Sequence, residues 1–244
     1  MNPIYYSKNR LLGHRQYRYI IFVLLATFIF IQPGRSQVVN ESTKKKISVG
    51  IGEFTDIWLN MPAGVKTRTI NQGFTILGTY NIPFGKSNFS FAIGLELTFH
   101  NMYGNFFVDS KTDYTSFNKI PGEVSYKKSK LKVGYFEIPV EFRFKSKSKV
   151  TVALGFKGGI LLDSGTKYVG DTINTNNYIL KNDGKAKIKL SGIKNLEQFS
   201  YGPTFRIGYS WINVNASYMI STLFKNGKGP ETYPLSLGII LMPF

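Results

Sequence analysis

The feature that most constrains this sequence is an alternation of apolar and other residues with a period of two. It recurs in eight segments, which are residues 47–58, 73–84, 89–100, 131–144, 149–162, 199–210, 212–224 and 233–244. A period of two is typical of β-strands, in which successive side chains point to opposite faces of the sheet. The segments are close to the roughly 9–11 residues that a tilted strand needs to cross a bilayer. The sequence therefore predicts an all-β fold.

The connections between these segments alternate strictly between short and long. The short ones are residues 85–88, residues 145–148 and a reversal near Ser210, whereas the longest are residues 101–130 and 163–198. In an up-and-down barrel with both termini at one end, all short turns fall at that end and all long loops at the other. We therefore predict an eight-stranded antiparallel up-and-down transmembrane β-barrel over residues 47–244, with short turns in the periplasm and long loops outside the cell.

The two faces of each predicted strand differ in chemistry. In residues 136–144, Phe136, Ile138 and Phe142 share one face, and Glu137, Glu141 and Arg143 share the other. A Lys or Arg that faces lipid at mid-bilayer costs about 2–4 kcal/mol, so we expect the charged face to line the lumen. The predicted lumen network consists of Glu96, Glu137, Glu141, Arg143, Lys157 and Arg206. An eight-stranded barrel has room only for its own side chains, so we interpret these residues as lumen-filling salt bridges rather than as a proton or ligand site.

A soluble lipocalin-like barrel is the alternative fold, because it has a similar strand number but places its apolar face inside. The small residues on the polar face suit a narrow lumen and, with the terminal Phe244, favour the membrane barrel. The last segment, residues 233–244, is apolar on both faces. This predicts either a bulge near Ile239 and Ile240 or an inward apolar plug.

The N-terminal region has the pattern of an export signal. Residues 1–18 are polar and basic, residues 19–31 are apolar, and small residues, Gly34 and Ser36, precede Gln37. We predict a signal peptide over residues 1–36, cleaved between Ser36 and Gln37, and a short periplasmic lead over residues 37–46. The alternative is a retained anchor, but the apolar run is shorter than the roughly 20 residues that span a bilayer as a helix.

The chain is strongly basic, with a formal net charge of +17. Such a charge is compatible with nucleic acid, an anionic membrane surface or acidic partners. The lysines lie in predicted turns and loops, as at residues 44–46, 127–130 and 145–149, without a recognition helix or an RNA-binding aromatic motif. We expect no nucleic-acid partner.

Residue types that carry catalysis are scarce. The chain has no cysteine, His100 is the only histidine after the predicted signal peptide, and no G-x-S-x-G motif occurs. A Ser-His-acid site would have to use His100. We interpret His100 as an interfacial or hydrogen-bonding residue and predict a protein that is not an enzyme and has no metal or cofactor.

A group of aromatic residues lies close to the end of the third segment. Its members are Phe99, Tyr103, Phe106 and Phe107. They form either a ligand platform or an aromatic girdle at the membrane boundary, and Tyr80, Phe84 and Phe89 would be their counterparts at the other boundary. We interpret them as a girdle.

Three features resemble the PorT-like family of outer-membrane barrels: YFEIPV at residues 135–140, LGFKGG at residues 154–159 and the final strand that ends in Phe244. The resemblance extends over nearly all of the chain after the signal peptide. It implies insertion by the barrel-assembly machinery, for which Phe244 resembles the usual signal. It also implies membership of a group whose named member assists type IX secretion.

These observations leave two hypotheses for function. The first is a structural or assembly role in the outer membrane, with membrane lipid and proteins of a secretion or gliding apparatus as partners. The alternative is a surface binding module that uses the long loops 101–130 and 163–198. An enzyme, the third possibility that we considered, would depend on His100.

Overall fold

The computed structural model describes residues 46–110, 113–171, 174–175, 178–179 and 186–242. They all belong to the unit Glu41–Phe244, one of two units into which the chain divides. The predicted signal peptide at residues 1–36, its cleavage site at Ser36 and Gln37, and Phe244 lie outside the described residues. Within these residues there is no helix that is both long enough and apolar enough to cross a membrane.

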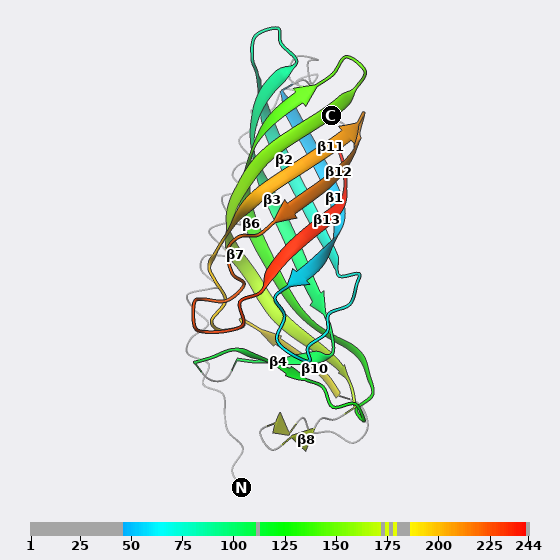
Figure 1. The fold of residues 1–244 in the computed structure, drawn as a ribbon, viewed down its shortest axis with the longest axis vertical. Coiled ribbons are helices and arrows are strands. Elements are labelled where there is room, and N and C mark those ends of the chain that lie inside the picture. The colour runs from blue at the N-terminus through cyan, green and yellow to red at the C-terminus, as the bar shows by residue number, and fades with distance from the viewer. Residues whose placement is uncertain (1–45, 111–112, 172–173, 176–177, 180–185, 243–244) are drawn as a thin grey trace, which may run out of the picture. The chain divides into compact units, whose positions relative to one another are not determined.

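The described chain forms a closed antiparallel barrel of eight strands, which confirms the predicted fold class (Figure 1). The strands are β1 (Ile47–Leu59), β2 (Gln72–Pro83), β3 (Phe89–Tyr103), β6 (Tyr126–Lys145), β7 (Val150–Gly170), β11 (Phe199–Tyr209), β12 (Ile212–Tyr218) and β13 (Tyr233–Leu241). Each pairs with the next in this order, and β1 pairs with β13 to close the sheet. Short connections lie at one end, the turn end, and the four long connections lie at the other, the loop end, at the bottom of Figure 1.

Two central strands are longer than predicted. β6 begins at Tyr126 and β7 continues to Gly170, so both project past the barrel, where β7 also pairs with β10 (Ala186–Ser191). A bulge marks the place where the projection begins: Tyr135 pairs with Leu161 but Gly134 pairs with Asp163. Leu162 is left without a partner in this pairing, and the predicted alternation shifts by one residue beyond it.

The outer wall of the barrel is apolar. Exposed side chains such as Leu95, Ile138, Leu154 and Val214 cover it. An apolar surface of this extent marks contact with lipid or another apolar partner. Glu53 of β1 is an exception, because it is exposed between apolar neighbours on the same wall.

The loop end is closed by a folded body that we call the cap. It consists of residues 60–71, 104–110, 113–125, 186–198 and 219–232 together with the projecting parts of β6 and β7. It includes the hairpin β4 (Phe106–Asp109) and β5 (Ser116–Lys119). A further pair, β8 (Asn174–Thr175) and β9 (Tyr178–Ile179), lies between β7 and β10 in the sequence.

One apolar cluster joins the cap to the barrel interior. Its buried members are Trp58, Val65, Met102, Phe106, Val108, Phe117, Leu131, Val133, Tyr135, Ile193, Leu196, Met219, Leu223 and Phe224. β12 therefore ends at Tyr218 rather than at the predicted residue 224, because the chain beyond it turns inward to bury Leu223 and Phe224. The cap is thus packed onto the barrel by burial of apolar surface.

The turn end of the lumen has a smaller apolar plug made of Leu77, Ile240 and Met242. β13 keeps a continuous register with β1 across Ile239 and Ile240, so the doubly apolar last strand is explained by an inward plug and not by a bulge. Gly52 makes room for it, since a Cβ added there would lie 2.7 Å from a side-chain carbon of Ile240.

Candidate functional site

The candidate site is the polar part of the lumen, which begins beside the turn-end plug, where Arg206 Nη1 contacts Met242 Sδ, and extends toward the cap. All six predicted network residues lie there, and β3, β6, β7 and β11 supply them. The fraction of the side chain that is exposed ranges from 1% for Glu137 to 11% for Lys157. The structure brings these residues together in two ion-pair clusters.

The first cluster is centred on Lys157. Its Nζ lies 2.7 Å from Glu137 Oε2 and 3.5 Å from Glu96 Oε1. Glu96 and Glu137 are direct cross-strand neighbours on β3 and β6, so their like charges need a cation between them. The hydroxyl of Thr98 donates to Glu137 at 2.7 Å, and the hydroxyl of Thr75 donates to Glu96 at 2.7 Å.

The second cluster is centred on Glu141. Its Oε2 accepts from Arg143 Nε at 2.6 Å and from Arg206 Nη2 at 2.5 Å. Arg143 also donates to the side-chain oxygen of Asn81 and, at 3.0 Å, to Thr79. Three acids therefore share three basic side chains across the two clusters, and hydrogen bonds satisfy many of the remaining polar atoms.

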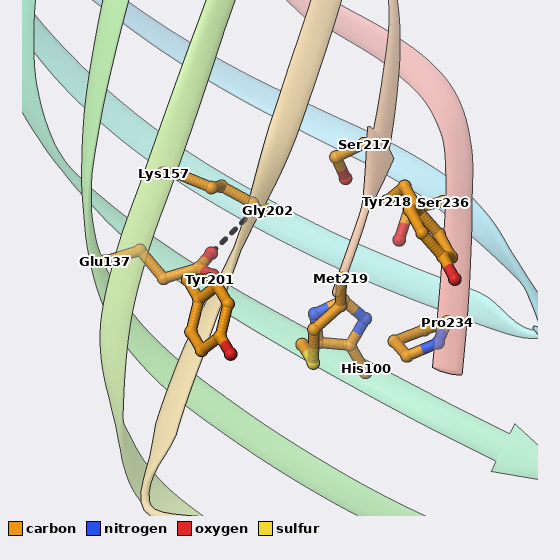
Figure 2. A pocket seen from close by; sticks show the side chains of 10 residues that line it. All are labelled: His100, Glu137, Lys157, Tyr201, Gly202, Ser217, Tyr218, Met219, Pro234 and Ser236. Carbon is orange, nitrogen blue, oxygen red and sulfur yellow. Dashed lines mark hydrogen bonds and ion pairs between the residues drawn. The ribbon is translucent and has the colours of Figure 1, made fainter. Parts of the chain in front are cut away.

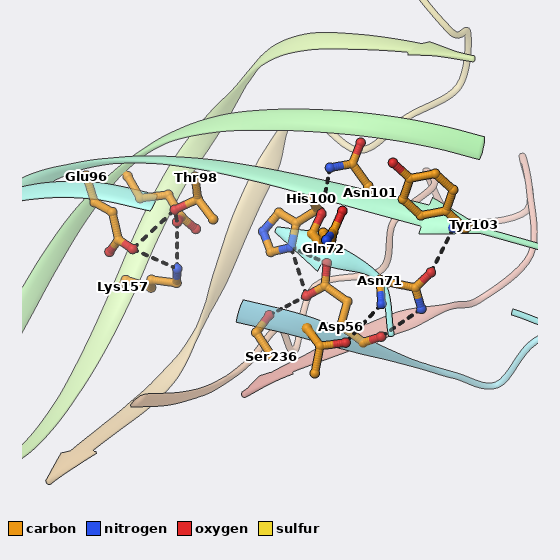
Figure 3. Close-up of polar contacts among 12 residues, drawn as sticks. Asp56, Asn71, Gln72, Glu96, Thr98, His100, Asn101, Tyr103, Lys157 and Ser236 are labelled. Carbon is orange, nitrogen blue, oxygen red and sulfur yellow. Dashed lines mark hydrogen bonds and ion pairs between the residues drawn. The ribbon is translucent and has the colours of Figure 1, made fainter. Parts of the chain in front are cut away.

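A third polar group, not predicted from the sequence, surrounds Asp56 (Figure 3). Its carboxylate lies 3.0 Å from Nδ1 of His100 and accepts a hydrogen bond of 2.6 Å from Ser236. A Ser-His-acid relay instead requires the serine to contact the second imidazole nitrogen, Nε2. Here the serine contacts the acid, and Nε2 of His100 has no hydrogen-bond partner among the described residues. This order of contacts does not activate a serine nucleophile.

A small pocket of about 10 Å³ lies beside this group (Figure 2). His100, Lys157, Met219 and Ser236 are among the residues that line it. This volume holds about one water molecule and no larger ligand. The described residues also contain no cluster of three or more His, Asp or Glu that could hold a metal ion.

The aromatic-girdle prediction is wrong for the two phenylalanines of β4. Phe107 packs against Ile120 and Tyr168 in the cap. Phe106 is fully buried in the cap cluster, because the chain after β3 folds back as the β4–β5 hairpin. Phe99 is exposed on the outer wall, as a girdle requires. Tyr103 is half-buried and is surrounded by cations, which are described below.

Sequence reasoning missed Asp56, His100 and Ser236 as members of the lumen layer. The sequence could have placed Asp56 in the lumen, because it lies an even number of residues from Gly50 and Gly52 in the same strand, and these glycines also face inward. Ser236 and the lumen threonines carry no charge and give no comparable signal. Only the strand register shows that they lie beside the acids.

A closed barrel with an apolar outer wall and an ion-paired, filled lumen defines the class of transmembrane β-barrels. In agreement, the model of the family described as "Outer membrane protein beta-barrel domain" matches residues 40–222. The chain belongs to this family and is an outer-membrane β-barrel protein.

Two solved structures of the attachment invasion locus protein Ail of Yersinia pestis are similar to the chain. One, in complex with the heparin analogue sucrose octasulfate, is 14% identical, with a TM-score of 0.38 over 81% of this chain and 97% of that chain. Another, determined in a phospholipid bilayer nanodisc, is 15% identical, with a TM-score of 0.33 over 81% and 98% of the two chains. A comparison with curated proteins found no match.

Proposed function

We propose that this protein is a non-conducting, non-catalytic outer-membrane anchor whose cap is a docking surface for another component of the cell envelope. In this proposal an N-terminal signal peptide exports the chain, the barrel-assembly machinery inserts it, the turn end faces the periplasm and the cap faces outward. This proposal develops the second of the two hypotheses from the sequence, the surface binding module.

The observation that carries the proposal is that the four long connections are fastened to one another. The backbone N–H of Thr115 donates to the carbonyl of Lys228 at 2.8 Å, and its hydroxyl donates to the carbonyl of Lys194 at 3.0 Å. The side-chain amide of Asn60 donates to the carbonyl of Glu231 at 2.7 Å. A surface that is ordered before binding loses less conformational entropy when a partner docks, so a preformed cap favours binding.

The filled lumen supports the non-conducting part of the proposal. The apolar plug at the turn end, the two ion-pair clusters and the cap cluster all lie in the interior and occupy its space. An eight-stranded barrel is just wide enough to be filled by its own side chains. Reconstitution into planar bilayers is expected to give no single-channel conductance.

Site-specific photo-crosslinking in living cells tests the docking surface. A photoreactive residue replaces exposed Lys194 or Lys225 in the cap, and the matched controls carry it at exposed Lys86 or Lys147 at the turn end. We expect one defined crosslinked product from the cap positions and none from the controls. Products from neither cap position, or the same products from all four, would contradict the proposal.

A second proposal, supported by the resemblance of residues 135–140 and 154–159 to the PorT-like family, is a role in assembly of a secretion or gliding apparatus such as type IX secretion. It predicts that a deletion strain loses a defined set of exported proteins and that the wild-type gene restores them. Crosslinks confined to Lys86 and Lys147 would favour this role, because the periplasmic end would then hold the partner. An unchanged profile of secreted proteins would contradict it.

A further inference from the structure

The outer face of the projecting sheet is rich in lysine. We call this surface the lysine face, and its members are Lys128, Lys130 and Lys132 of β6, Lys167 of β7, and Lys187 and Lys189 of β10. The strand register places Lys130, Lys167 and Lys189 side by side across the three strands. The opposite face of the same sheet is apolar, with Tyr168 and Ile188 packed into the cap.

The lysine face begins where the lipid-facing wall ends. On β6 the outward residues from Phe144 to Gly134 carry no charge. This ten-residue step rises about 25 Å along the barrel axis, at about 3.3 Å per residue and a tilt of about 40°. The lipid-facing band of such barrels is also about 25 Å tall. Lys132, the next outward residue, therefore lies at the boundary of the hydrocarbon, and Lys130 and Lys128 follow in the headgroup layer.

Three cations converge on one tyrosine in this layer. Arg68 Cζ, Lys128 Nζ and Lys130 Nζ lie 5.3, 5.6 and 5.1 Å from the centre of the Tyr103 ring. The carboxamide oxygen of Asn101 accepts a hydrogen bond of 2.6 Å from Lys130 Nζ, which fixes that ammonium group. Cation–π contacts with the ring lower the electrostatic cost of placing these three cations close together, but they do not neutralise the positive charge.

Few acids neutralise the lysine face. Among the described residues, the one ion pair that a lysine of this face makes is Lys132 with Asp163, at 2.7 Å. Local desolvation and the repulsion of Lys128, Lys189, Lys187 and Lys130 lower the pKa of Lys167. Mutual repulsion of this kind is relieved when an anion binds.

The simplest explanation for such lysines is that they protect the edge of a sheet from pairing with another chain. It accounts for Lys187 and Lys189, because β10 is an edge strand. It does not account for Lys130 and Lys132, because at these residues β6 is paired on both sides, with β3 and β7. A different role is needed for these two lysines.

We propose that the lysine face binds the phosphate groups of anionic lipids in the leaflet at the loop end. Its charge is complementary to these headgroups, and it continues the same wall that contacts the lipid tails. The inference rests on the membrane placement of the barrel and does not depend on the partner of the cap. In the proposed orientation the lipids belong to the outer leaflet.

Lipid retention measured by native mass spectrometry tests this inference. The purified protein is given phosphatidylglycerol or lipid A in competition with phosphatidylcholine. The test variant is K128Q/K130Q/K167Q, and the control variant, K86Q/K145Q/K147Q, removes equal charge at the turn end. A lysine near an anionic surface contributes about fivefold to affinity, so the test variant should lose about 100-fold of the preference for anionic lipid. The control variant should keep the wild-type preference.

Three results would overturn the inference. They are no anionic preference in the wild type, an unchanged preference in the test variant, and an equal loss in the control variant. Binding of a soluble polyphosphate that depends on the lysines, without any lipid preference, would also overturn it. A heat-modifiable gel shift in each variant shows that the barrel is folded, so that loss of lipid binding is not loss of structure.

Discussion

Replacement of Lys157 by methionine is the sharpest test of the lumen network. The change keeps the length of the side chain but leaves Glu96 and Glu137 without the cation that lies 3.5 and 2.7 Å away. Because both carboxylates are buried, we expect the variant to be less stable than the wild type by about 3–5 kcal/mol, the usual cost of breaking a buried ion pair. With a urea dependence of about 2 kcal/mol per molar, the unfolding midpoint falls by about 2 M.

Equilibrium unfolding in urea with the protein in lipid vesicles measures this change. Buried Trp58 reports on the barrel interior through its fluorescence. The double variant K157M/E137Q should recover at least half of the loss, because it removes one of the two uncompensated charges. The matched control is K86M at the exposed turn, where the change should be within about 0.5 kcal/mol. A midpoint shift below about 0.5 M in K157M, or a double variant less stable than the single one, would refute the reasoning.

Four further predictions use the same unfolding assay or limited proteolysis of the cap. G52V should cost about 1–3 kcal/mol by overpacking against Ile240, and a second change, I240A, should restore part of the stability, whereas additive losses would count against the plug. F106A should lose about 3–5 kcal/mol of packing and expose the cap to limited proteolysis while the barrel stays heat-modifiable; a resistant cap would disagree. E53L should stabilise the barrel in lipid by about 1 kcal/mol, because it removes a charge from the apolar wall, and a decrease would reveal a partner for Glu53. Burial and the nearby Asp171 raise the pKa of Tyr168 in the folded protein above its ordinary value of about 10. The stability that the neutral phenol gives the cap is therefore complete below the ordinary pKa and is lost as the pH rises through the pKa of the folded state. Proteolysis of the cap should increase over that pH range in the wild type and increase less in Y168F.

The sequence predicted the barrel because two independent patterns agreed. The period of two located the strands, and the alternation of connection lengths determined the topology. Strand ends were predicted less well where the chain leaves the membrane. Residues 126–130 belong to β6 but were predicted as part of a loop. The reason is that their outward positions hold lysines where the lipid-facing strands have apolar residues.

The lumen was predictable only in its charged members. Glu137 and Arg143 stand out in an apolar strand, since charge on the lipid face is costly. Asp56 and Ser236 meet across the β1–β13 pairing and lie 180 positions apart in sequence, so no local pattern connects them. Phe106 was misassigned because an aromatic residue just after a strand has the same local pattern in a girdle as in a cap core.

The fastening of the cap also reinforces the seam at which the barrel closes. Asn60, just after the first barrel strand, holds the carbonyl of Glu231, just before the last one. That bond lies next to the pairing of β1 with β13, which closes the sheet. Contacts of such long sequence separation carry a loop-closure cost in entropy, so a second contact at the same seam is easier to form once the first is made. The cap therefore acts as a clasp at the seam of the barrel, because it opposes separation of the first and last strands.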